Sequence, residues 1–265
     1  MNCKNCNNNL RDSQKFCDEC GAKVIQNRLK PKVLAQQVNE QFLCVDNKFL
    51  RTFIDLFRTP ETVIIGYING TRKKYIDVLQ YFAIALTLAG IQLFLMKTFF
   101  IEQFENPFQI IDSSIEGSKF MQDYQNQMNT LMQDGNNFQS IMYILSVPFS
   151  AIGTWVTYYF TGFKKYNFTE HLVINLYYSA QIIIITSVFF ILTSIFGINF
   201  AISGILITII TFIYQCYVFK RTTAQSTLES FAKMLMTYAV VGLQFLILLI
   251  VFVVVVIILK VLNII

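Results

Sequence analysis

Long runs of apolar residues dominate the chain after residue 77, and within these runs neither a helical stripe nor an alternating pattern is visible. A helix needs about 20 predominantly apolar residues to cross the hydrocarbon core of a bilayer. Five stretches meet this requirement without a single Asp, Glu, Lys or Arg, namely residues 78–96, 141–163, 172–196, 200–219 and 238–259. The pattern therefore predicts an all-α integral membrane protein, with about five transmembrane helices in a bundle over residues 78–265.

The third and fourth predicted spans are separated by Gly197, Ile198 and Asn199, which favours a helical hairpin. An alternative count has four spans, with one helix of this hairpin re-entrant. It leaves Lys220 and Arg221 without a consistent side of the membrane, so five spans are the preferred prediction.

Residues 25–77, before the first span, carry apolar positions at helical spacing. One apolar stripe falls within 33–42, and a second one within 49–57. Residues 59–61, Thr-Pro-Glu, have the composition of a helix start, and Gly70 provides a stop. We expect amphipathic helices here that either lie in the headgroup plane or pack on the cytoplasmic ends of the spans.

The segment 97–140 is long for a connection between two spans, and it contains six acidic residues against two lysines. Apolar residues recur at helical steps between 118 and 133, which predicts a helix. We expect either an external cap with a partner surface or a solvated lid over the bundle.

Charge gives an orientation. Residues 1–77 hold 13 Lys and Arg against 8 Asp and Glu, whereas the remaining residues hold 8 of each. The basic residues of the short connections all fall on one side if the N-terminus is inside: Arg72, Lys73, Lys74, Lys164, Lys165, Lys220, Arg221 and Lys233. No apolar leader of a signal peptide is visible in residues 1–30. The positive-inside rule then predicts a cytoplasmic N-terminus and an external C-terminus.

Membrane lipids are one expected partner. The triplet Arg72, Lys73 and Lys74 is first of all a topology signal, and it is also a candidate contact for lipid headgroups, at about 1 kcal/mol per cation. Nucleic acid is not an expected partner, because no element carries a stripe of Lys and Arg interleaved with aromatic residues.

Four cysteines occupy the first 24 residues in the pattern Cys-x2-Cys-x10-Cys-x2-Cys: Cys3, Cys6, Cys17 and Cys20. Structural disulfides are rare in a reducing cytoplasm, and two such pairs can close a tetrahedral Zn²⁺ shell. We therefore expect a structural zinc ribbon over residues 1–24, in which Gly21 permits a left-handed turn after Cys20. Two disulfides or four unbound thiols are the alternatives.

A resemblance appears in LRTFIDLFRTPETVIIGYINGTRKKYIDVLQYF, residues 50–82. With the cysteine pairs, it resembles a bacterial family of zinc-ribbon, multi-pass membrane proteins catalogued as a domain of unknown function (DUF3667). The likeness extends over about residues 1–96 and implies the bacterial cytoplasmic (inner) membrane, but no activity. The chain departs from the family at Asn39-Glu40, where a His-Glu pair is usual, and at Ile76-Asp77, where Asn-Pro is usual.

The sequence offers little catalytic chemistry. His171 has no evident partner, and the usual zinc-protease, serine-hydrolase and nucleotide-binding motifs are missing. Gln92, Asn175 and Gln181 lie in predicted spans, where amides bond between helices or line a cavity for a polar substrate.

The leading hypothesis is a non-enzymatic membrane protein whose ribbon and amphipathic helices bind a protein partner or a second copy. The alternative is a channel, transporter or lipid-handling protein, and a membrane enzyme using external carboxylates such as Asp112 or Glu116 is a third.

Overall fold

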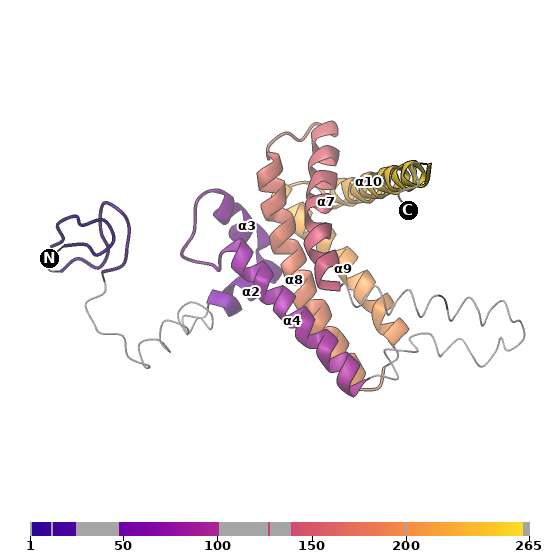
Figure 1. Ribbon diagram of the computed structural model, residues 1–265, viewed down its shortest axis with the longest axis horizontal. Coiled ribbons are helices and arrows are strands. Elements are labelled where there is room, and N and C mark those ends of the chain that lie inside the picture. Colours follow the sequence, from indigo (N-terminus) through magenta and orange to yellow (C-terminus); the bar gives the residue numbers. More distant parts are fainter. Residues whose placement is uncertain are drawn as a thin grey trace, which may run out of the picture. The chain divides into compact units, whose positions relative to one another are not determined.

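The computed structural model describes residues 2–11, 13–24, 48–100, 127, 139–198 and 200–261. The chain divides into two compact units, Met1–Asn47 and Lys48–Ile265. The described part of the first unit contains two isolated antiparallel bridges, and that of the second unit is helical (Figure 1). The helix expected within 33–42 and the one expected within 118–133 fall outside the described residues.

Two short helices precede the long ones: α2 (Lys48–Arg58) and α3 (Pro60–Ile68). Pro60 stands in the first turn of α3, where a missing N–H is tolerated. Thr59 holds the cap position, but its hydroxyl pairs with that of Thr62 at 3.1 Å and not with a backbone N–H. The chain turns after α3 at Gly70, whose φ of +97° lies in the left-handed region that glycine adopts without strain.

Five long helices follow, and each is long and apolar enough to cross a membrane. They are α4 (Val78–Phe99), α7 (Gln139–Phe160), α8 (Phe168–Ile195), α9 (Phe200–Thr223) and α10 (Thr227–Val261). The described residues thus confirm an all-α fold with five candidate spans. α8 and α9 each have spanning length, and Phe190 stacks on Phe200 at 4.7 Å across the predicted hairpin.

Local signals set where two of these helices begin. The Asp77 side chain accepts the Leu79 N–H at 3.0 Å and caps α4. Asn167 and Glu170 form a reciprocal capping box, so α8 begins at Phe168, ahead of the predicted 172.

The long helices alternate in direction. Contacts of Tyr81 with Gln181 and of Met96 with Ser194 make α4 and α8 parallel. α7 runs antiparallel to α8, since the Ser150 hydroxyl bonds to Asn175 while the Tyr158 ring lies against His171. α10 runs antiparallel to α7, since Phe149 stacks on Phe245 while the Tyr158 ring lies under the Lys233 ammonium. α10 also runs antiparallel to α9, since Gln215 bonds to Tyr238 while Lys220 bonds to Thr227.

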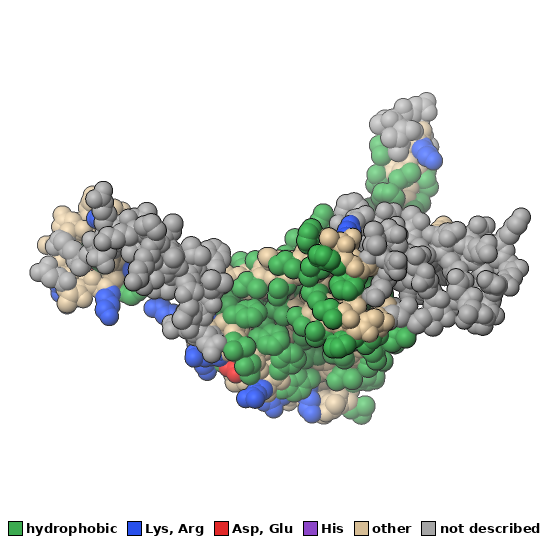
Figure 2. All heavy atoms as spheres, turned by 90° about the horizontal axis from the view of Figure 1, so that it is seen from below, with side chains coloured by type: hydrophobic (Ala, Val, Ile, Leu, Met, Phe, Trp, Pro, Cys, Tyr) green, Lys and Arg blue, Asp and Glu red, His purple; other side chains and the backbone are tan. Residues whose placement is uncertain are grey.

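One end of this body gathers cations. The N-terminal ends of α4, α8 and α10 lie with the C-terminal ends of α7 and α9, and we call this the basic end. It carries Arg72, Lys73, Lys74, Lys164, Lys165, Lys220, Arg221 and Lys233. Figure 2 shows Lys and Arg side chains along one margin of an otherwise apolar surface. Most apolar side chains of α10 from Leu243 to Ile258 are exposed, as expected of a helix that faces lipid.

Candidate functional site

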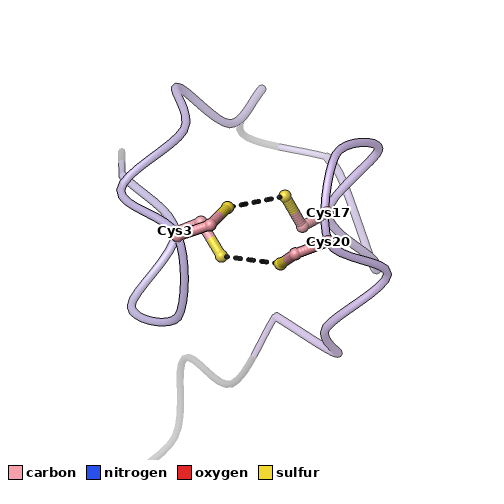
Figure 3. A group of neighbouring side chains, drawn as sticks. Cys3, Cys17 and Cys20 are labelled. Carbon is pink, nitrogen blue, oxygen red and sulfur yellow. Dashed lines mark hydrogen bonds between the residues drawn. The ribbon is translucent and has the colours of Figure 1, made fainter.

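The four cysteine sulfurs of the first unit converge on one point, and all of them lie within 4.8 Å of one another (Figure 3). The sulfurs of Cys3 and Cys20 are 3.7 Å apart, and those of Cys6 and Cys17 are 3.6 Å apart. Zinc about 2.3 Å from four tetrahedral sulfurs requires sulfur–sulfur separations of roughly 3.8 Å. A disulfide requires about 2.05 Å. The arrangement therefore fits a four-thiolate metal site and not two disulfides.

The two Cys-x2-Cys turns are built alike. The Cys3 N–H donates to Asn8 O at 2.8 Å, and the Asn7 N–H donates back to Cys3 O at 2.9 Å. Cys17 repeats both bonds with Ala22 and Gly21, at 2.8 and 2.9 Å. The residue after each second cysteine is left-handed, with φ +60° at Asn7 and +70° at Gly21. The left-handed turn predicted at Gly21 is thus confirmed, and Asn7 is its counterpart, which sequence reasoning missed.

The thiols differ in how readily they lose a proton. Hydrogen bonds from the Asn5 side chain and from the backbone of Ala22 lower the pKa of the Cys20 thiol to about 6. The backbone of Asn8 lowers the pKa of the Cys6 thiol, but hydrogen bonds with the other thiols and desolvation outweigh it and raise that pKa to about 12. Since metals bind thiolates, the lowered pKa of Cys20 favours its thiolate form, and with it metal binding, near neutral pH.

The apolar interior around this site is very small. Cys3, Leu10 and Cys17 are buried, and Ala22 and Val24 pack against them. So few apolar groups cannot hold a folded unit of this size, which is why such ribbons depend on metal. Phe16 is 52% exposed and adds little to this interior.

The second unit contains a different constellation, in which side chains of the long helices hold α2 in place. Leu56 O would normally accept the N–H of residue 60, but Pro60 has none. The Tyr214 hydroxyl donates to that oxygen at 3.0 Å, in a buried position. The Tyr217 hydroxyl donates to Arg58 O at 2.8 Å.

The turn between α3 and α4 is tied down in the same way. The Tyr75 hydroxyl donates to the Asp55 carboxylate at 2.9 Å, and the Ile76 N–H donates to Thr52 Oγ1 at 3.1 Å. The Tyr177 hydroxyl of α8 donates to Ile76 O at 2.8 Å. Of the two arrangements expected for the second apolar stripe, packing on the ends of the candidate spans is the one that the full burial of Leu56 supports. Thr52, on the same helix but not in the stripe, is also fully buried. Leu50, Ile54 and Phe57 stay partly exposed on the same helix.

The predicted headgroup triplet lies in this turn. Arg72, Lys73 and Lys74 are exposed. The Arg72 guanidinium lies 3.8 Å from the centre of the Tyr67 ring, and the Lys74 ammonium lies 5.0 Å from that of Tyr75. Their contact with lipid stays a prediction.

The three amides predicted to line a cavity are all buried. Asn175 donates to Thr154 Oγ1 at 2.9 Å and to His171 O at 2.8 Å. Gln181 donates to Phe53 O at 3.2 Å and accepts from the Tyr81 hydroxyl. Gln92 Oε1 has no hydrogen-bond partner among the described residues. Asn175 and Gln181 therefore link elements, and a cavity for a polar substrate stays a prediction.

A buried cluster at the basic end was missed by sequence reasoning. Lys233 is 5% exposed and pairs with Glu229 at 2.8 Å. Its ammonium lies 5.1 Å from the centre of the Tyr158 ring, and that ring also contacts His171. Neither His171 nitrogen has a hydrogen-bond partner among the described residues. The sequence signal that could have revealed this cluster is the i, i+4 spacing of Glu229 and Lys233. Such a pair stabilises a helix, and α10 accordingly begins before the predicted span, at Thr227.

The fold and the site define a helical protein with five candidate spans and a cysteine cluster that can hold a metal. Residues 46–90 match the family described as "Protein of unknown function (DUF3667)". The match covers α2, α3, the turn and the first half of α4, and it confirms the resemblance over that segment. No curated protein and no solved structure matches the chain.

Proposed function

We propose that this protein is a non-enzymatic, multi-pass membrane protein whose zinc ribbon and amphipathic helices form a module for binding a protein partner or a second copy. The observation that carries the proposal is the closed cysteine site. Four sulfurs at tetrahedral spacing fill the coordination shell of zinc, so they leave no position for a substrate. A site of this kind stabilises a surface and does not perform chemistry.

The surface of the ribbon supports a binding role. Phe16 is 52% exposed although so small a unit has few apolar groups to spare. Exposed aromatic side chains are the usual anchors of protein interfaces. Lys15 precedes Phe16 in the chain, and Lys23 lies opposite Phe16 in an antiparallel bridge, so cationic residues lie close to this aromatic side chain along the backbone.

The docked segment supports the second half of the proposal. Tyr177, Tyr214 and Tyr217 of α8 and α9 bond to backbone oxygens of α2 and of the turn before α4. Arg221 of α9 also pairs with Glu61 of α3 through Nε and Oε2 at 3.0 Å. A displacement of α2 or α3 is therefore coupled directly to α8 and α9 through these bonds, as an anchoring or transmitting module requires.

The proposed location is the bacterial cytoplasmic membrane, with the N-terminus inside and the C-terminus outside. The concentration of cations at the basic end supports this orientation. Lys97 and Lys260 are the described basic residues at the opposite ends of α4 and α10. An odd number of spans places the two termini on opposite sides.

Purification of the full-length protein in mild detergent, followed by mass photometry, tests the interaction role. We expect a stoichiometric partner or a homo-oligomer, which Phe16→Ala weakens at least about tenfold. Leu248→Ala is the matched control, because Leu248 is 45% exposed on α10, outside the ribbon and the amphipathic helices. A monomer without a partner, or an equal loss in both variants, contradicts the proposal.

A further inference from the structure

Figure 1 shows the turn where α7 ends and α8 begins, at the basic end of the helical body. A pocket of about 440 Å³ opens at this turn. Trp155 and Tyr159 of α7 form one wall, and the turn 163–167 with Glu170 forms the other. Pockets that hold small ligands typically measure about 300–1,000 Å³, so this one has room for a headgroup. None of its residues belongs to the cysteine site or to the docked segment.

Two lysines give the pocket its charge. The Lys164 ammonium lies 4.7 Å from the centre of the Tyr159 ring, and the Lys165 ammonium lies 5.2 Å from that of Tyr166. Both lysines are exposed. The rings hold the two cations at the pocket by cation–π attraction without neutralising them. They remain available to an anion.

The one carboxylate in the pocket is already engaged. Glu170 Oε2 accepts the Asn167 N–H at 2.7 Å, and Asn167 Oδ1 accepts the Glu170 N–H at 2.9 Å. This reciprocal cap binds the acidic side chain to the start of α8. The pocket therefore keeps a net positive charge, from two ammonium groups against one carboxylate.

The rear wall is fixed and borders another cation. The Tyr166 hydroxyl donates to Thr222 O at 2.9 Å, and the rings of Tyr166 and Phe163 pack at 5.9 Å. Behind Phe163, the Lys233 ammonium lies 5.5 Å from the ring centre. Glu229 pairs with Lys233, so Lys233 adds little to the net charge near the pocket. Its contact with Phe163 nevertheless helps to hold the rear wall in place.

Exposed aromatic side chains surround the mouth of the pocket. Trp155 and Tyr159 are 36% and 47% exposed, and Phe160 and Phe168 beside them are 81% and 38% exposed. Aromatic side chains of this kind collect where a spanning helix passes from the acyl chains into the headgroups. The cations of the turn thus stand next to a lipid surface.

We propose that this pocket binds a phosphate-bearing group, with Lys164 and Lys165 on the phosphate and Trp155 and Tyr159 against the rest of the ligand. The group is either the headgroup of an anionic lipid or a soluble phosphate ester. Lipid is the source that the exposed aromatic rim favours. The proposal stands independently of the interaction role of the ribbon.

Native mass spectrometry of the full-length protein in detergent micelles tests the site. The probes are phosphatidylglycerol, phosphatidylcholine and glycerol 3-phosphate. We expect phosphatidylglycerol to bind the wild type, and the double variant Lys164→Gln/Lys165→Gln to bind it at least about tenfold more weakly, since each of the two cations near a lipid surface contributes about fivefold in affinity. Phosphatidylcholine should bind more weakly than phosphatidylglycerol, because its choline cation is repelled by the lysines.

The matched control is Lys97→Gln/Lys260→Gln, which changes the charge equally at exposed positions outside the basic end. It should bind phosphatidylglycerol like the wild type. If glycerol 3-phosphate competes with equal affinity and only the pocket variant loses it, the site is a phosphate site with a soluble source. Equal binding by the pocket variant and the wild type, or an equal loss in the control, overturns the proposal.

Discussion

The Tyr214 hydroxyl donates a hydrogen bond of 3.0 Å to the backbone oxygen of Leu56, which lies 158 residues earlier in the chain. Pro60 creates the need for this bond, since it deprives Leu56 O of its helical N–H donor. The pairing therefore attaches a short amphipathic helix to the spans at the point where that helix cannot satisfy its own backbone.

Replacing Tyr214 with Phe should expose the cost of that unsatisfied oxygen. An unpaired buried acceptor costs about 1–3 kcal/mol, so we expect Tyr214→Phe to lower the free energy of unfolding by this amount. Denaturant titration in detergent micelles measures the change.

Tyr217→Phe is the control for this measurement. Tyr217 makes the equivalent bond to Arg58 O in an exposed position, where water can replace it. We expect a loss of less than about 0.5 kcal/mol. Equal losses in the two variants are incompatible with the capping role of Tyr214.

The contact between α7 and α10 depends on a missing side chain. A Cβ placed on Gly153 would lie 2.5 Å from Val241 Cγ2 and 3.5 Å from Thr237 O. Val241 is β-branched, so it cannot rotate away cheaply inside a helix. We expect Gly153→Ala to destabilise the protein by about 1–3 kcal/mol, measured by thermal unfolding in detergent.

Gly242→Ala is the matched control on the facing helix, because a Cβ there has nothing within 4 Å. It should be neutral or slightly stabilising, since alanine suits a helix better than glycine. If both substitutions were equally harmless, α7 and α10 would not pack as closely as described.

The orientation can be tested with two exposed lysines at opposite ends of the body. A membrane-impermeant maleimide applied to intact cells should modify the protein carrying Lys260→Cys and leave that carrying Lys73→Cys unmodified. Permeabilised cells should give labelling of both. The reverse pattern in intact cells would place the N-terminus outside.

The spans and the cysteine cluster were accessible to sequence reasoning because each depends on a local pattern. Apolar runs predict lengths, and Cys-x2-Cys turns are set by the few residues around them. The predicted ends of the helices were less accurate, because charged residues were taken to end a span. α10 instead begins at Thr227, where Glu229 pairs with Lys233 and carries the helix beyond the apolar run.

The packing of α2 against α8 and α9 could not be predicted from the sequence. The hydrogen bonds of Tyr177, Tyr214 and Tyr217 reach 101, 158 and 159 residues back along the chain. No local pattern encodes such a pairing. Pro60 was a partial sequence signal for this docking. A proline four residues after Leu56 has no N–H, so it indicates that Leu56 O needs another hydrogen-bond donor.

The pocket at the α7–α8 turn illustrates the same limit. Lys164 and Lys165 were assigned a role in topology, which their sequence position supports. That they flank two rings and an open volume depends on how the turn folds back against α7.

The central claim is that four cysteines hold one structural zinc ion, and elemental analysis of the purified full-length protein tests it most directly. We expect about one zinc per chain, which Cys216→Ser retains and which the variant with serine at Cys3, Cys6, Cys17 and Cys20 loses. Chelation of the wild type should also make the ribbon sensitive to protease, since its few buried groups cannot keep it folded. A wild-type protein that contains no zinc, and whose mass shows two disulfides, would contradict the account.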